Sequence, residues 1–327
     1  MDSNTKPDLT FEIPGVIQVY KDGRVDRLIG ADYVPPSTDP STGVTSKDVT
    51  IFPESNISAR FYLPKLTHPN QKSPLLVYFH GSGFCVLSPF SHATFHNYLN
   101  KLVAEANVVA VSVDYRKAPE HPIPAAYEDS WAALQWVVAH SGDGPEPWLN
   151  EHADFGRVFL AGESAGGNIA HNMAMVAGDP DIGLGLGLLG VALIHPLFWG
   201  ADPVGSEGSD PERKARADEV GRLWSFVCPS NPDCDDPRIN PVVPGGPGLV
   251  GLGCRRVLVC VAEKDILKDR GWLYFEALGR SGWMGVVEIE ETLGEDHAFY
   301  FNDLECEKAT KLITRLAGFL NRNMPLL

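Results

Sequence analysis

The feature that most restricts how this chain can fold is the pentapeptide Gly-Glu-Ser-Ala-Gly at residues 162–166. It follows the apolar run 158–161 and precedes a helix-compatible run that starts at Gly167. A serine at the tip of so tight a turn takes a strained backbone conformation, and small neighbours let strand and helix approach closely. The five-residue pattern alone arises often by chance, but this context is the one that a G-x-S-x-G turn requires. The segment therefore predicts a strand, a sharp turn and a helix that present the hydroxyl of Ser164 as a nucleophile.

An acid and a histidine follow Ser164 in the chain order that such a turn predicts. Asp265 comes after the apolar run 257–261, and His297 lies in the loop after the strand-like run 286–292. The Asp265 carboxylate can accept from the histidine's Nδ1–H, so that His297 Nε2 can take the proton of Ser164 during attack on a carbonyl. Read alone, Asp265 could instead cap the next helix. Together, the three residues predict a catalytic triad of Ser164, Asp265 and His297.

A glycine-containing loop upstream supplies the second half of the predicted site. Residues 80–84 read His-Gly-Ser-Gly-Phe and directly follow the apolar run 75–79. Acyl transfer needs backbone N–H groups aimed at the carbonyl oxygen, where negative charge develops, and glycines leave consecutive amides uncovered. We predict an oxyanion hole built from this loop and from the residue after Ser164; its expected members are Gly81, Ser82, Gly83 and Ala165. Gly81 is expected to shape the loop, and His80 to hydrogen-bond within it.

A third motif carries a family resemblance. Residues 114–126 read Asp-Tyr-Arg-Lys-Ala-Pro-Glu-His-Pro-Ile-Pro-Ala-Ala. The patterns H-G-G-G, D-Y-R-x-A-P-E-H-x-x-P-A-A and G-x-S-A-G are the signature of plant carboxylesterases of the hormone-sensitive-lipase type, and the chain resembles this family over nearly its whole length. The resemblance implies an α/β-hydrolase fold and a serine carboxylesterase that acts on small esters. Ser82 departs from the family pattern, because it replaces the middle glycine and brings a hydroxymethyl group to the border of the oxyanion pocket.

The same plant group is similar to proteins with other activities. Gibberellin receptors keep the fold but lose the triad histidine, so His297 argues against a small-molecule hormone receptor. The 2-hydroxyisoflavanone dehydratases and related cyclases use the same pocket for elimination or rearrangement, and some of them carry threonine in place of the serine. Ser164 favours hydrolysis through an acyl-enzyme, and it leaves a dehydratase or cyclase of plant specialised metabolism as the alternative.

The order of predicted elements indicates an α/β-hydrolase domain at 44–327. From residue 75 onward strands and helices alternate, which is typical of a mostly parallel central sheet flanked by helices. Strands are expected near 75–80, 108–114, 158–163, 190–197 and 256–261, and helices near 92–105, 125–139, 166–176, 269–280 and 305–321. Two runs that alternate apolar and polar residues, 44–51 and 58–63, predict half-buried antiparallel strands.

Two further segments are expected to form a cap over the site. Residues 1–43 are predicted to be an N-terminal arm with a pair of strands around 21–23. The insertion at about 200–245 is rich in Pro, Gly, Asp and Ser, and it holds one helix-like stretch at 212–226. Its apolar side chains need burial, so a cap is favoured over a disordered loop; these residues are Leu223, Trp224, Phe226 and Val227.

The composition of the chain, and one motif match in the wrong context, restrict the binding partners and cofactors that we expect. With 27 Lys and Arg against 42 Asp and Glu, the net charge of −15 argues against nucleic acid or anionic membranes. Residues 1–7 hold no apolar core of a signal peptide, which predicts a cytoplasmic protein, with the nucleus as a further location. No cofactor and no metal are expected: the run 185–190 matches G-x-G-x-x-G but precedes a strand where it should follow one. The expected partner is a small ester or specialised metabolite, bound by a monomer or homodimer.

Overall fold

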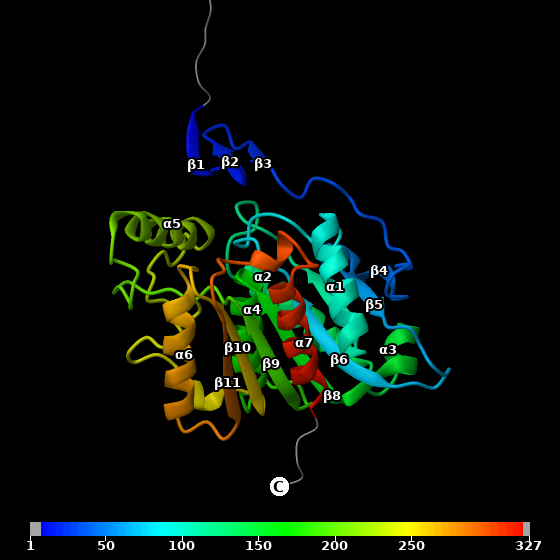
Figure 1. Ribbon diagram of the computed structural model, residues 1–327. Coiled ribbons are helices and arrows are strands. Elements are labelled where there is room, and N and C mark those ends of the chain that lie inside the picture. Colours follow the sequence, from blue (N-terminus) through cyan, green and yellow to red (C-terminus); the bar gives the residue numbers. More distant parts are fainter. Residues whose placement is uncertain (1–7, 323–327) are drawn as a thin grey trace, which may run out of the picture.

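An eight-stranded sheet runs through the middle of the molecule, and helices cover both of its faces (Figure 1). The computed structural model describes residues 8–322, so residues 1–7, on which the expectation about a signal peptide rests, lie outside the described range. The strand order is β11-β10-β9-β8-β6-β7-β5-β4. The strands are β4 (Thr45–Phe52), β5 (Ile57–Leu63), β6 (Ser73–Phe79), β7 (Val109–Asp114), β8 (Ala153–Glu163), β9 (Leu188–Ile194), β10 (Arg256–Ala262) and β11 (Val286–Thr292).

The sheet is parallel from β11 to β7, and β5 pairs antiparallel with both β7 and β4. Strands β6 and β10 are buried at every position, as expected for parallel strands with both faces covered. Side chains alternate between two cores, because successive residues of a strand point to opposite faces. Leu75 and Val77 of β6 enter one core, whereas Leu76 and Tyr78 enter the other. The predicted α/β-hydrolase architecture is thus confirmed.

The prediction that both antiparallel strands are half-buried is wrong for β5. Residues 59–62 are buried throughout, because β5 lies between β4 and β7 and both of its faces are covered. Strand β4 forms the edge of the sheet and does alternate between buried and more exposed positions. The pattern of apolar residues alone did not distinguish the edge strand from its inner neighbour.

Helices from different parts of the chain share each face of the sheet. Helices α1 (Ala93–Ala106) and α7 (Glu307–Asn321) pack against each other and enter one core. The other core takes residues of α2 (Ala125–Ala139), α4 (Ala165–Ala177) and α6 (Lys268–Arg280). The sequence did not predict the short helix α3 (Pro147–His152), which is less than two turns long and is capped by the Glu146 side chain. Three single turns complete the fold: η1 (Pro53–Ser55), η2 (Leu249–Gly251) and η3 (Phe299–Phe301).

The N-terminal arm and the 200–245 insertion lie beyond the same end of the sheet (Figure 1). The arm forms a three-stranded sheet of β1 (Leu9–Ile13), β2 (Ile17–Tyr20) and β3 (Val25–Arg27), which includes the predicted strand pair. The insertion carries helix α5 (Pro211–Val227). The two segments touch where Phe11 of the arm stacks on Phe226 of α5, with ring centroids 3.7 Å apart. Of the four apolar residues of α5 that were expected to need burial, Trp224 and Val227 are buried, whereas Leu223 and Phe226 are only partly buried.

Among the residues described, no helix is both long and apolar enough to cross a membrane.

Contact between the turn 162–166 and β6 leads to a stability prediction. A Cβ added to Gly166 would lie 1.9 Å from the backbone oxygen of Phe79, which cannot move without distorting the sheet. We expect Gly166→Ala to lower the free energy of unfolding by about 3 kcal/mol or to prevent folding. In Gly318→Ala on α7, the new Cβ has no atom of residues 8–322 within 4 Å, and alanine is the better helix former, so we expect a gain of up to about 1 kcal/mol. Urea unfolding of both variants measures the contrast; equal effects would contradict it.

Candidate active site

Ser164 stands at the turn between β8 and α4. Its backbone has φ 54° and ψ −119°, a conformation that a non-glycine residue rarely adopts. Neighbouring strands hold the turn: Ser164 N–H donates to Ile194 O at 2.9 Å, and Leu197 N–H donates to Ser164 O at 2.9 Å. Within 158–171, every residue is buried except Ser164, which is partly exposed. The turn therefore presents one hydroxyl from an otherwise buried segment.

Asp265 and His297 form a hydrogen-bonded pair next to this turn. His297 Nδ1 lies 2.7 Å from Asp265 Oδ2, and the other Asp265 oxygen accepts Leu267 N–H at 3.0 Å. Asp265 is buried, whereas 32% of the His297 side chain is exposed. Burial alone would lower the pKa of His297, but the nearby carboxylates, Asp265 foremost, together outweigh it and raise this pKa above its ordinary value. The bond places the proton on Nδ1 and leaves Nε2 free to act as a base.

Asp269, the neighbouring acid, makes a different contact. Its carboxylate accepts both the backbone N–H and the hydroxyl of Ser206, at 2.7 and 2.6 Å. It therefore anchors the 200–245 insertion to the start of α6 and does not contact His297. The next residue, Arg270, also anchors the insertion, because it forms a buried ion pair with Glu207 at 2.6 Å.

A second histidine, His195, lies beside this pair. It is buried at the end of β9, with its ring centroid 5.7 Å from that of His297. His195 Nδ1 accepts the backbone N–H of Ala298 at 2.9 Å, so its own proton is on Nε2. Burial lowers the pKa of His195 to about 3, which keeps the ring neutral. His195 thus holds the chain directly after His297.

The same three side chains are close enough to be considered as metal ligands. Potential ligand atoms of His195, Asp265 and His297 all lie within 4.8 Å of one another. The hydrogen bonds oppose such a site. The Ala298 N–H occupies the Nδ1 lone pair of His195, which leaves Nε2 protonated and unable to bind a cation. The donor set fits a hydrogen-bonding network better than a metal centre.

The loop after β6 contains backbone N–H groups that have no acceptor among residues 8–322. Ser82, Gly83 and Phe84 have positive φ angles in succession, at 83°, 62° and 62°. Within residues 8–322, the N–H groups of Ser82, Gly83 and Ala165 donate no hydrogen bond. The Ser82 hydroxyl donates within its own loop, to the carbonyls of Val86 (2.5 Å) and Gly81. It is therefore engaged by the loop's own backbone.

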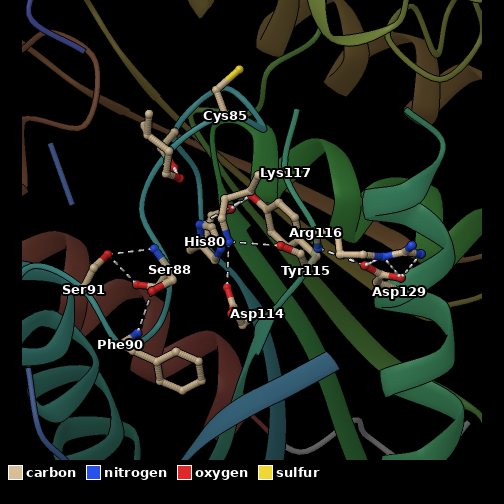
Figure 2. Close-up of polar contacts among 12 residues, drawn as sticks. His80, Cys85, Ser88, Phe90, Ser91, Asp114, Tyr115, Arg116, Lys117 and Asp129 are labelled. Atoms are coloured by element: carbon tan, nitrogen blue, oxygen red, sulfur yellow. Dashed lines mark hydrogen bonds and ion pairs between the residues drawn. The ribbon is translucent and has the colours of Figure 1, made fainter. Parts of the chain in front are cut away.

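The 114–126 motif contacts the start of this loop, and Figure 2 shows Tyr115 of the motif beside His80. The Tyr115 hydroxyl donates to His80 O at 2.7 Å, and the two rings stack with centroids 4.3 Å apart. Arg116 forms an ion pair with Asp129 of α2 at 2.7 Å, which fixes the segment to the helix layer. Burial lowers the pKa of His80 to about 3, so its ring is neutral and its contacts are structural.

Glu163, the variable residue of the pentapeptide, joins the two halves of the site. Its Oε1 accepts Gly81 N–H at 2.6 Å, and its Oε2 accepts the Tyr78 hydroxyl. Gly81 N–H is thus occupied, in keeping with a loop-shaping role. Burial raises the pKa of Glu163 to about 7, because its effect is larger than the opposing effect of these hydrogen bonds. An acid at the end of an otherwise apolar run was the sequence signal for this role.

A cavity of about 370 Å³ lies between the arm, α5 and the Asp265 segment. Its apolar wall includes Phe11, Leu223 and Ile266, and the last of these directly follows Asp265. Its charged members are Glu12, Arg216, Glu219 and Arg222. The run 185–190 has no part in the site. It leads into the amino end of β9, whereas Ser164 follows the carboxyl end of the neighbouring strand β8.

The elevated pKa of Glu163 gives a pH-dependent stability. Since the folded value of about 7 exceeds the ordinary value of 4.5, the folded state keeps a proton that the unfolded state releases. The contribution of Glu163 to stability is then greatest below pH 4.5 and is lost as the pH rises through about 7; the interval corresponds to about 3 kcal/mol. Glu163→Gln removes this titration while its amide oxygen can still accept Gly81 N–H. We expect urea unfolding to show wild type losing about 3 kcal/mol relative to this variant between pH 4.5 and 8.

Glu151→Gln, at an exposed position, is the control. Its free energy of unfolding should differ from that of wild type by the same amount at every pH. A constant difference for Glu163→Gln as well would mean that its carboxyl titrates normally.

Comparisons with known proteins agree with this architecture. A family model described as alpha/beta hydrolase fold matches residues 76–301. The chain is 47% identical to "Probable carboxylesterase 2" of Arabidopsis thaliana over 319 residues, with 98% of each chain covered. It is 46% identical to "2-hydroxyisoflavanone dehydratase" of Glycyrrhiza echinata over 325 residues, covering 97% of this chain and 98% of that one.

Among solved structures, a hyperthermophilic esterase from the archaeon Pyrobaculum calidifontis superimposes with a TM-score of 0.69 at 28% identity, covering 84% of each chain. The strand order, the serine turn and these matches lead to one assignment. The chain belongs to the alpha/beta hydrolase family, in the group that contains plant carboxylesterases and 2-hydroxyisoflavanone dehydratases.

Proposed function

We propose that this protein is a serine carboxylesterase that hydrolyses small carboxylic esters through an acyl-enzyme at Ser164. The observation that carries the proposal is the 2.7 Å bond between His297 and Asp265, beside the strained turn that presents Ser164. An activated serine needs a base whose tautomer is fixed by a third group, and this pair meets that need. The relatives named as carboxylesterases support the same reaction class.

In the proposed mechanism, His297 Nε2 takes the Ser164 proton as Oγ attacks the ester carbonyl. Asp265 stabilises the imidazolium that forms, and the imidazolium then protonates the leaving alcohol. Water, activated by the same nitrogen, hydrolyses the acyl-enzyme and restores the serine. The raised pKa of His297 helps the ring to accept the proton, while the free base still predominates above that pKa.

The negative charge of the tetrahedral intermediate falls to backbone donors. We assign this role to the N–H groups of Ser82, Gly83 and Ala165, which have no other acceptor within residues 8–322. Such preorganised donors are worth about 3 kcal/mol each in transition-state stabilisation. Gly81 shapes the hole because Glu163 fixes its N–H.

The 370 Å³ cavity is our proposed substrate site, and the arm with the 200–245 insertion is the proposed cap above it. Its size suits a small ester, and its apolar wall next to Asp265 suits an uncharged acyl or alcohol group. We further propose that the enzyme acts in the cytoplasm, with the nucleus as a further location, as a monomer or homodimer.

A dehydratase or cyclase of plant specialised metabolism is the second candidate, favoured by the relative named 2-hydroxyisoflavanone dehydratase. Elimination needs a base near an acidic C–H and donors for an enolate oxygen. His297 and the same backbone N–H groups could serve both needs without an acyl-enzyme.

We expect Ser164→Ala and His297→Ala each to reduce ester hydrolysis by about a thousandfold or more, and their losses not to add, because the residues act as a unit. Asp265→Asn should lose most of the activity through the wrong histidine tautomer. Asp269→Asn is the matched control, because Asp269 binds Ser206 and not His297. Turnover of p-nitrophenyl acetate and labelling by a fluorophosphonate probe measure these effects. More than about a tenth of wild-type turnover in Ser164→Ala would refute the nucleophile assignment.

Ser164→Thr separates esterase from dehydratase. A β-branched nucleophile crowds acyl attack but keeps a hydrogen-bonding hydroxyl. We expect this variant to lose ester hydrolysis and to gain no elimination of hydroxyisoflavanone-type substrates. The esterase assignment would fail if the wild type eliminated water well above its best ester hydrolysis rate and the threonine variant retained that activity.

A further inference from the structure

Helix α5 reaches the loop that carries His297 through one arginine. Arg216 Nη2 donates to Asp296 Oδ1 at 2.9 Å, and its Nη1 donates to Lys264 O at 3.4 Å. The same Asp296 oxygen accepts the backbone N–H of His297 at 2.7 Å. Lys264 directly precedes Asp265. One guanidinium thus contacts the chain neighbour of each member of the Asp265–His297 pair.

The same helix also reaches the opposite side of the site. A Cβ added to Gly83 would lie 3.2 Å from Leu223 Cδ2, so Leu223 packs directly on the loop with the unused N–H groups. Arg216 and Leu223 both line the 370 Å³ cavity. Helix α5 therefore bridges the proposed oxyanion loop and the histidine loop across the space where a substrate would lie.

The ion pair itself contributes little to the stability of the fold. The Arg216 and Asp296 side chains are 34% and 49% exposed, and solvent screens pairs of this kind. Its importance lies in its position. We propose that Arg216 is a positioning residue for turnover, which acts through Asp296 to hold His297 in the orientation that serves Ser164. This inference rests on the proposed role of His297 as the base.

The charged groups around His297 allow the proposed role of Arg216 to be measured through the pH dependence of kcat/KM. The ionisable groups that face His297 come from five elements or loops and are Glu163, His195, Arg216, Asp265 and Asp296. After Asp265, Asp296 is the next carboxylate that raises the pKa of His297. Arg216 forms an ion pair with this carboxylate. Removing Arg216 should raise the pKa of His297 and move the acidic limb of kcat/KM to higher pH. Removing the Asp296 charge should move that limb to lower pH.

The test compares Arg216→Gln, Arg216→Lys, Asp296→Asn and the double variant Arg216→Gln/Asp296→Asn, with p-nitrophenyl acetate as substrate. We expect kcat to fall about tenfold in Arg216→Gln, because the histidine loop loses its anchor, and partial recovery in Arg216→Lys. The two charge-removing single variants should shift the acidic limb in opposite directions by a few tenths of a pH unit. The double variant, in which both charges are absent, should return the limb toward the wild-type position without restoring kcat.

Lys308→Gln is the matched control. Lys308 of α7 binds Glu295 of the same loop at 2.7 Å, but neither residue contacts the His297 N–H. We expect its kcat to stay within twofold of wild type. An equal loss in Lys308→Gln, or a limb that moves in the same direction in both single variants, would overturn the inference. Wild-type behaviour of all Arg216 variants would overturn it too, whereas full activity of Ser164→Ala or His297→Ala would overturn the proposed function itself.

Discussion

The close approach of α4 to the end of β6 is the constraint on which the rest of the site depends. Gly166 touches the backbone of Phe79 so closely that no side chain fits between them. This contact forces Ser164 into its strained turn and brings the loop after β6 within reach of Glu163. The Glu163 side chain then joins the two segments, so the candidate nucleophile and the proposed backbone donors are positioned by one packing contact and one hydrogen-bonded acid.

Burial decides how the three acids near His297 behave. Asp265 is buried but accepts two hydrogen bonds, and His297 holds its pKa below the ordinary value. Glu163 is buried without a cationic partner in contact, so its pKa rises to about 7. Asp296 stays largely exposed and is paired with Arg216. The pKa of His297 therefore depends on burial and on the carboxylates of Asp296 and Glu163, in addition to the charge of its direct partner Asp265.

Much of this organisation could be predicted from residue order. The strands and helices from β6 to α7 follow the predicted alternation, because long apolar runs and the serine turn leave few alternatives. The prediction failed where an element's environment decided the outcome: β5 is an inner strand, and α3 is too short to show a periodicity. Nothing in the sequence marked the buried His195 as a neighbour of His297, because a histidine after an apolar run carries no signal of what lies beside it.

The sequence by itself determined the fold class and identified the candidate nucleophile, acid and base. Local rules suffice for these, since a G-x-S-x-G turn between a strand and a helix allows few conformations. Only the tertiary structure decided that Glu163 bonds Gly81, that His195 holds the chain after His297, and that Arg216 reaches Asp296. The partners in these pairs are separated by 80 or more residues along the chain. They meet because the carboxyl ends of the parallel strands lie at the same end of the sheet and α5 packs above that end. Residue order alone does not reveal such a proximity.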